Sequence, residues 1–143
     1  MRLNNTLKTL ITAGFILLIA GCSASEAAKQ KAALYQFDEL TEVTTIDNFR
    51  MDGWRTMDNR TVFVDSRPRE TYLLVLNGVD SNLKFAKALL VSSRMGKVTV
   101  GFDSVATDEN PKLRTQIKKI YRIESKEQEQ QVRQKIESFS GKE

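Results

Sequence analysis

Trp54, Arg55, Asp58 and Arg60 place four functional side chains within seven positions of the chain. They supply an indole ring, a carboxylate and two guanidinium groups. A guanidinium can bind a carboxylate or phosphate through two parallel hydrogen bonds, and an indole face can stack on a cation or a flat ligand. Asp103, which follows Phe102, could face the same end of a sheet. The cluster therefore predicts a small pocket for an anionic or sugar-like ligand.

A structural role explains the same residues, and it is the interpretation that we favour. A lone tryptophan in a small domain is normally packed into the core. An aspartate just before a strand often accepts hydrogen bonds from the turn, so Asp58 could cap that turn or pair with Arg60. Arg67 and Arg69 flank Pro68 at an expected hairpin tip and are interpreted as a solvated loop or, together with Lys84 and Lys87, as a basic patch facing lipid.

The composition excludes most catalytic chemistry. The chain has no histidine and a single cysteine, which removes the common zinc, haem and copper ligand sets and His- or Cys-based nucleophilic catalysis. The spacing of its acidic residues does not bring a catalytic pair of carboxylates together, and no glycine-rich phosphate loop or nucleophile elbow is present. We therefore expect no enzyme activity, no cofactor and no metal.

The single cysteine, Cys22, ends an apolar segment that begins at Leu10. Arg2 and Lys8 precede this segment, which has the length of a secretory signal and is well short of the roughly 20 residues that span a bilayer. The sequence Leu18-Ile19-Ala20-Gly21-Cys22 resembles the lipobox of bacterial lipoproteins. Residues 1–21 are accordingly interpreted as a cleaved lipoprotein signal peptide.

The lipobox resemblance implies that Cys22 anchors the protein to a membrane. In such lipoproteins the thiol receives a diacylglycerol and the new amino terminus receives a further acyl chain such as palmitate. Two or more chains hold a protein firmly, whereas one gives only marginal binding. Ser23 stands where lipoproteins retained in the inner membrane of many Gram-negative bacteria carry aspartate. We therefore expect an outer-membrane anchor facing the periplasm.

Charge gives no sign of a nucleic-acid partner. The whole chain has 22 basic and 18 acidic residues, and removal of Arg2 and Lys8 with the leader leaves a small positive excess. Because the two signs are interspersed and an exported lipoprotein meets little nucleic acid, nucleic-acid binding is not expected.

Three segments follow the leader. Residues 22–45 contain many good helix formers and are interpreted as a tether that is either solvated or partly helical. Residues 46–123 are expected to form a β domain, in which β-branched and aromatic runs such as Thr61–Val64 and Thr71–Leu76 alternate with turns at Asp52-Gly53 or Asp58-Asn59 and at Met95-Gly96. Val98, Val100 and Phe102 are expected on one face of a strand.

Residues 124–143 are expected to form a polar C-terminal helix. Ser125 and Gln128 match a capping box, and Val132, Ile136 and Phe139 recur at helical spacing. This narrow apolar stripe could dock on the domain itself, which we favour, or on a partner. The fold class is therefore mainly β (α+β): a small antiparallel β-barrel or sandwich of about five or six strands with a C-terminal helix.

A series of motifs within residues 46–123 resembles a domain of small, uncharacterised bacterial envelope lipoproteins. The motifs, in order, are Ile46-x-x-Phe49, Trp54-Arg55-x-Met57-Asp58-x-Arg60-Thr61, Tyr72-Leu73-x-x-Leu76, Leu83-x-Phe85-Ala86 and Gly101-Phe102-Asp103-x-Val105. Members of that family often carry two cysteines, and the corresponding places here, near Asp80 and Thr115, have none. The resemblance implies a shared fold and an envelope location, and it implies no activity.

Together these patterns predict a lipid-anchored envelope lipoprotein with a non-catalytic structural or protein-interaction role. Its partners would be membrane lipid, through acylated Cys22, and another envelope protein. The alternative is a periplasmic module that binds a small anionic or sugar-like ligand with Trp54 and the neighbouring arginines.

Overall fold

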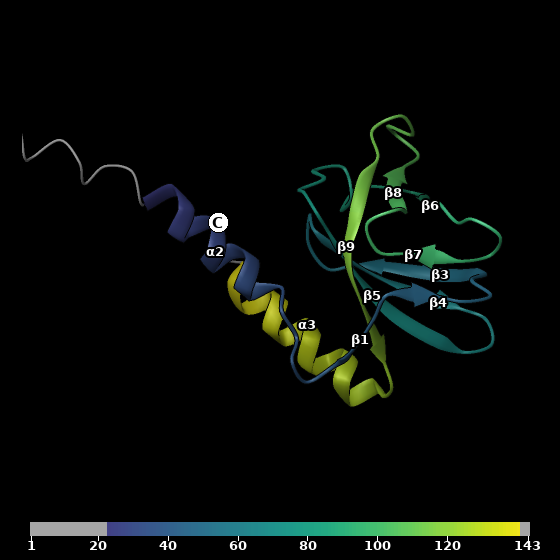
Figure 1. Cartoon of the computed structure of the whole chain (residues 1–143), viewed down its shortest axis with the longest axis horizontal. Coiled ribbons are helices and arrows are strands. Elements are labelled where there is room, and N and C mark those ends of the chain that lie inside the picture. Colours follow the sequence, from purple (N-terminus) through teal and green to yellow (C-terminus); the bar gives the residue numbers. More distant parts are fainter. Residues whose placement is uncertain (1–22, 141–143) are drawn as a thin grey trace, which may run out of the picture. The chain divides into compact units, whose positions relative to one another are not determined.

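The computed structural model describes residues 23–140, and the predicted signal peptide 1–21 and the predicted lipidation site, Cys22, lie outside this range (Figure 1). The elements in chain order are α2 (Ser23–Leu34), β1 (Thr41–Val43), β2 (Thr45–Ile46), β3 (Met51–Thr56), β4 (Thr61–Ser66), β5 (Glu70–Leu76), β6 (Leu89–Val91), β7 (Val98–Thr99), β8 (Ser104–Thr107), β9 (Thr115–Ile123) and α3 (Lys126–Ser140).

Helix α2 fills the first half of the predicted tether. Its twelve residues are mainly alanine, lysine, glutamate and glutamine, which have high helix propensity. A compact folded unit begins after it, at Phe37. The tether was therefore partly helical, as one of the two alternatives had it.

The folded unit begins earlier than residue 46, where the sequence placed the start of the β domain. Phe37 and Leu40 are buried, and β1 pairs with β9 from Thr41 opposite Arg122 to Val43 opposite Ile120. The Phe37 and Tyr121 rings pack edge to face, with their centroids 5.5 Å apart. A three-residue strand with one apolar side chain has too little periodicity to be recognised in the sequence.

The main sheet is antiparallel and curls into a nearly closed barrel, which decides between the barrel and sandwich alternatives. Within residues 23–140 its strand order is β3-β4-β5-β9-β8-β6, with β1 also paired to β9 and a separate β2-β7 ribbon. The expected hairpin between the two central runs is confirmed by the β4-β5 pairing, from Thr61 opposite Val75 to Ser66 opposite Glu70. Strand β9 lies between β5 and β8 and is the longest strand (Figure 1).

Alternation along the strands separates two apolar layers. One face of β4 and β5 points into the barrel, where Val62, Val64, Leu74 and Leu76 join residues from the other strands. The opposite face carries Phe63 and Leu73, which lie directly opposite each other and are also fully buried. Because both faces are covered, the runs in β4 and β5 are apolar on both faces, as expected of central strands.

Helix α3 covers part of the outer layer. The Ser125 hydroxyl accepts a hydrogen bond from the Gln128 N–H at 3.2 Å, which confirms the predicted cap. Val132 and Ile136 are completely buried, and α3 contacts β9. The apolar stripe therefore docks on the protein's own sheet.

Two local predictions were wrong. Asp52-Gly53, one of the two places offered for a turn, lies in β3, at an irregularity in the pairing between Met51 and Gly53. Phe102 was expected on one strand face with Val98, but Val98 is buried and Phe102 is 71% exposed. Gly101 has φ 78°, so the chain turns before Phe102 and the strand alternation ends there.

Candidate functional site

The structure separates the predicted cluster. Trp54 and Arg55 are neighbours on β3, so their side chains point to opposite faces of the sheet. Trp54 packs against the core inside the barrel. Arg55 lies on the outer face, 5.8 Å from the centre of the Phe63 ring, and forms ion pairs with Asp65 and Glu129. The two side chains cannot line one pocket.

Arg55 acts as a link between the sheet and α3. Its guanidinium donates to Asp65 on β4 and, through Nε at 3.2 Å, to Glu129 on α3. Burial raises the pKa of Asp65, but hydrogen bonds from Arg55 and Thr71 outweigh it and hold that pKa below its ordinary value. These contacts give Arg55 a structural role.

Asp58 caps the turn between β3 and β4. Its Oδ1 accepts from the Arg60 N–H at 2.9 Å, the Thr61 N–H at 2.7 Å and the Thr61 hydroxyl at 2.6 Å. Its Oδ2 accepts from the Ser140 hydroxyl at 3.4 Å, near the end of α3. The carboxylate is buried and faces its own turn, as the structural interpretation predicted.

Asp103 is buried in a different turn. Its Oδ1 accepts from the Ser92 hydroxyl at 2.7 Å, and its Oδ2 accepts from the Thr99 N–H at 2.8 Å. The Ser92 hydroxyl oxygen in turn accepts from the Ser104 N–H at 2.9 Å. Asp103 therefore fixes the connection between β7 and β8 and does not join Trp54 or Asp58 in a site.

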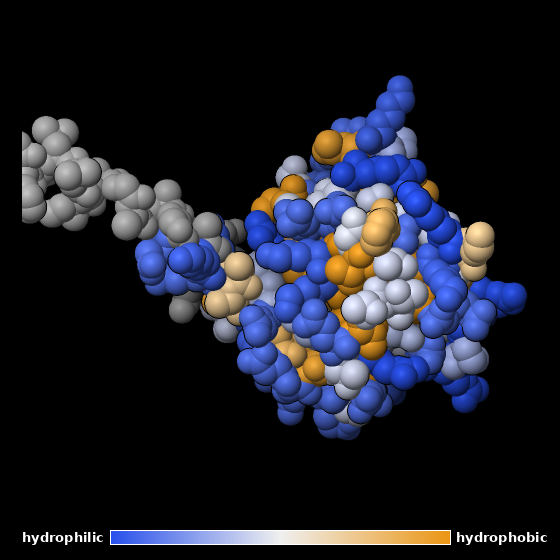
Figure 2. All heavy atoms as spheres, viewed as in Figure 1, coloured by the Kyte–Doolittle hydropathy of each residue, from blue (hydrophilic) through white to orange (hydrophobic). Residues whose placement is uncertain are grey.

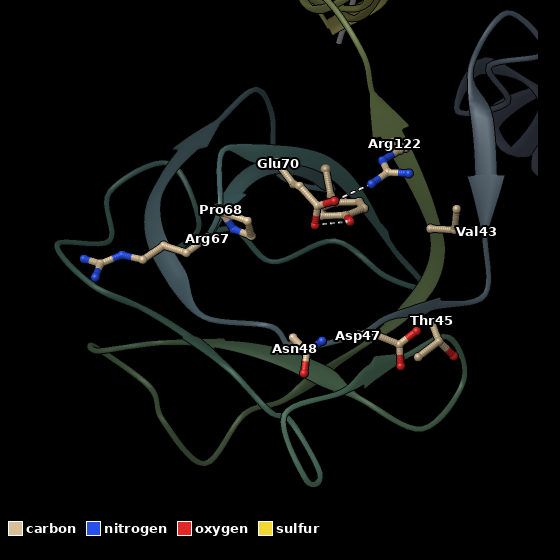
Figure 3. A pocket seen from close by; sticks show the side chains of 9 residues that line it. Val43, Thr45, Asp47, Asn48, Arg67, Pro68, Glu70 and Arg122 are labelled. Atoms are coloured by element: carbon tan, nitrogen blue, oxygen red, sulfur yellow. Dashed lines mark hydrogen bonds and ion pairs between the residues drawn. The ribbon is translucent and has the colours of Figure 1, made fainter.

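A pocket of about 330 Å³ lies at one mouth of the barrel. Figure 3 shows this mouth pocket from close by. It is formed by the segment that contains β1 and β2, by the turn between β4 and β5, and by the end of β9. Its lining residues are Val43, Thr45, Asp47, Asn48, Arg67, Pro68, Glu70, Tyr72 and Arg122.

Glu70, Tyr72 and Arg122 form a hydrogen-bonded group on one side of the mouth pocket. Glu70 and Tyr72 are two positions apart on β5 and share a face, and Arg122 lies opposite Tyr72 on β9. The Tyr72 hydroxyl donates to Glu70 Oε2 at 2.9 Å, and Arg122 Nη2 donates to Glu70 Oε1. Burial and the Glu70 carboxylate raise the pKa of Tyr72 to about 12, so the phenol stays protonated over the physiological range.

Asp47 and Thr45 lie across the pocket from this group (Figure 3). Asp47 Oδ1 pairs with Lys97 Nζ at 2.8 Å, and the Thr45 and Thr99 hydroxyls are 3.3 Å apart. Asn48 has φ 52°, a conformation that asparagine tolerates well. Arg67 lines the rim, but its guanidinium pairs with Asp52 at 2.7 Å and points away from the pocket in Figure 3.

A second depression of about 470 Å³ lies beside the same β4-β5 turn. It is lined mainly by charged side chains, including Asp52 on β3, Asp65 on β4 and Arg69 in the turn. It shares Arg67, Pro68 and Glu70 with the mouth pocket.

The sequence did not identify the mouth pocket. Its residues come from three separated parts of the chain, and only the pairing of β5 with β9 brings Glu70 next to Arg122. Tyr72 offered a signal, because it carries a polar hydroxyl at the start of the apolar run of β5, and a buried hydroxyl needs a hydrogen-bond partner.

Among residues 23–140, no three histidine, cysteine, aspartate or glutamate side chains gather in a way that could hold a metal ion. No helix in that range has the length and apolar character needed to cross a membrane.

The fold and pocket define a class: a small antiparallel barrel with a polar mouth and one helix packed on its outer face. The chain belongs to a family of unknown function, DUF6491, whose model matches residues 5–139. No curated protein and no solved structure matches the chain.

Proposed function

We propose that this protein is a lipid-anchored module of the bacterial envelope that binds a small ligand at the mouth of its barrel and catalyses no reaction. The observation that carries the binding role is the mouth pocket. Small-ligand sites are concave, and they combine apolar walls with a few polar groups that orient the ligand. A volume of about 330 Å³ lies at the small end of the usual range.

The anchor is supported by the sequence around Cys22. The apolar segment, the small residues before the cysteine and the absence of aspartate at Ser23 favour acylation and an outer-membrane location facing the periplasm. The helical segment α2 follows directly and begins at Ser23. Twelve helical residues extend over about 18 Å, at about 1.5 Å for each residue.

The non-catalytic role is supported by how the polar groups of the pocket are used. Glu70 accepts from both Tyr72 and Arg122, and the raised pKa of Tyr72 makes its phenol a poor general acid or base near neutral pH. Asp47 is paired with Lys97. These groups suit recognition better than proton transfer.

The anchor is tested by labelling cells with a palmitate analogue and separating their membranes. We expect label on the wild-type protein in the outer-membrane fraction and none on a Cys22→Ala variant, because the thiol is the acylation site. Ser23→Asp is the matched variant: it should keep the label and move the protein to the inner membrane. An unlabelled wild-type protein would overturn the proposal of a lipid anchor.

A protein-interaction role is the second candidate, and exposed apolar side chains favour it. Phe85 is 75% exposed and Met95 is 99% exposed. On the face drawn in Figure 2, apolar atoms lie in several patches between hydrophilic side chains. Crosslinking in the intact envelope tests this role through Phe85→Ser and Met95→Ser variants. Deletion of α3 would not test it, because Val132 and Ile136 belong to the folded core.

A further inference from the structure

The mouth pocket places opposite charges on its two sides. Arg122 lies on one side with Glu70, and Asp47 lies across from them (Figure 3). Each of these charges already has one partner, because Arg122 pairs with Glu70 and Asp47 pairs with Lys97, so a ligand would add to the two ion pairs. The carboxylates prevent the pocket from being a simple anion site, because like charges in a partly desolvated space repel. The guanidinium prevents it from being a simple cation site. A ligand that carries both charges satisfies both sides.

The groups that face the pocket keep unused hydrogen-bonding capacity. Arg122 has five N–H donors, and in the described chain its ion pair with Glu70 uses Nη2. Asp47 pairs with Lys97 through Oδ1, which leaves Oδ2 to accept from a ligand. The Tyr72 hydroxyl, by contrast, is already engaged: it donates to Glu70, and Arg122 is hydrogen-bonded to the same phenol.

The apolar part of the lining argues against a sugar. Sugar-binding sites present an open aromatic face, and the only aromatic residue of the lining is Tyr72, which is 5% exposed. Val43 and Pro68 supply aliphatic wall instead. Such a wall suits a short aliphatic side chain, and a volume of about 330 Å³ has room for a molecule the size of one or two amino acids.

We infer that the mouth pocket binds a small zwitterion, namely an amino acid or a dipeptide, with its carboxylate on Arg122 and its ammonium group on Asp47. This inference rests on the proposed binding role of the mouth pocket and specifies its ligand class. Glu70 holds the Arg122 guanidinium in place and is a positioning residue.

The test is titration of the full chain in detergent micelles with L-alanyl-L-alanine, followed by calorimetry and by amide signals in NMR spectra. Two capped probes, the N-acetyl and the C-amide forms of the dipeptide, each lack one charge. Each cap should weaken binding about tenfold or more, because each removes a charge-assisted hydrogen bond. Amide signals of residues 43–48 and 67–72 should shift with the uncapped dipeptide.

Two variants assign the two ends of the ligand. Arg122→Gln should weaken binding of the dipeptide and make it insensitive to C-terminal amidation, while sensitivity to N-acetylation remains. Asp47→Asn should give the reverse pattern, and since Asp47 is exposed this variant will fold even if Arg122→Gln does not. Glu109→Gln and Arg114→Gln are matched controls on the loop before β9, and they should bind like the wild type.

The outcomes separate the ligand class from the binding role. If glucose or inorganic phosphate binds in the mouth pocket and the dipeptide does not, the zwitterion is overturned and the binding role stands. If none of these probes shifts signals of the pocket, both are overturned. Binding that ignores both variants would place the ligand elsewhere and would also overturn the inference.

Discussion

Replacement of Asp58 by alanine should destabilise the protein strongly although Asp58 lines neither of the two depressions described above. The substitution removes the acceptor of three hydrogen bonds, from the Arg60 N–H, the Thr61 N–H and the Thr61 hydroxyl. Thr61 is completely buried, so water cannot replace the lost acceptor for its two donors. An unsatisfied buried donor costs about 1–3 kcal/mol. We therefore expect the free energy of unfolding to fall by about 3–5 kcal/mol, a large part of the stability of a small domain.

The Asp58→Asn variant separates the contribution of the hydrogen bonds to stability from the contribution of the charge. The asparagine side-chain oxygen can still accept from Thr61, and its NH₂ group can donate to the Ser140 hydroxyl oxygen in place of the present bond. The loss should be about 1 kcal/mol, because only the charge assistance disappears. Asp52→Ala is the control: its ion pair with Arg67 is exposed, and such pairs contribute about 0–1 kcal/mol.

Urea unfolding gives the three values, with the fluorescence of the single tryptophan, Trp54, as the signal and circular dichroism as a second probe. If Asp58→Ala unfolds at the same urea concentration as Asp52→Ala, the turn does not depend on the carboxylate, and our explanation of why this residue is buried is wrong.

Two further predictions concern α3 and the mouth pocket. Ile136→Ala should lower the free energy of unfolding by about 2–5 kcal/mol, because it removes a completely buried side chain and leaves a cavity. The control Gln134→Ala, at an exposed position of the same helix, should change it by less than about 0.5 kcal/mol. Equal urea midpoints for the two variants would show that α3 does not pack as described. Tyr72 should ionise with a pKa of about 12 in the folded protein against about 10 when unfolded, so its contribution to stability is complete below about pH 10 and is lost as the pH rises through 12. Tyr72→Phe should therefore remove the last step of the phenolate absorbance titration, and an unchanged last step would contradict the assignment.

Short-range pattern predicted much of the fold. The β-branched and aromatic runs predicted β4 and β5, and the capping box with its apolar stripe predicted α3. These features depend on neighbouring residues alone. Strand β1 could not be predicted, because its three residues form a strand only through pairing with β9, about 80 positions later in the chain.

The prediction that Trp54 and Arg55 share a pocket was wrong, and the sequence already held the physical reason. Once Asp52-Gly53 was taken as a turn, Trp54 and Arg55 could be imagined side by side in a loop. In a strand, adjacent residues face opposite sides of the sheet, so a strand over Met51–Thr56 would have excluded a shared pocket. The mouth pocket was beyond prediction, because it requires the register that sets Tyr72 opposite Arg122.

Stability alone does not explain the charges at the mouth pocket. The Glu70–Arg122 pair is partly exposed, and pairs of this kind contribute about 0–1 kcal/mol. A phenylalanine at position 72 would need no hydrogen-bond partner and would fill nearly the same space among apolar neighbours. Apolar residues in place of Tyr72, Glu70 and Arg122 could therefore give the barrel nearly the same stability. What they add is a fixed guanidinium at an opening, facing a carboxylate on the other side, which is the property that a binding site for a zwitterion requires.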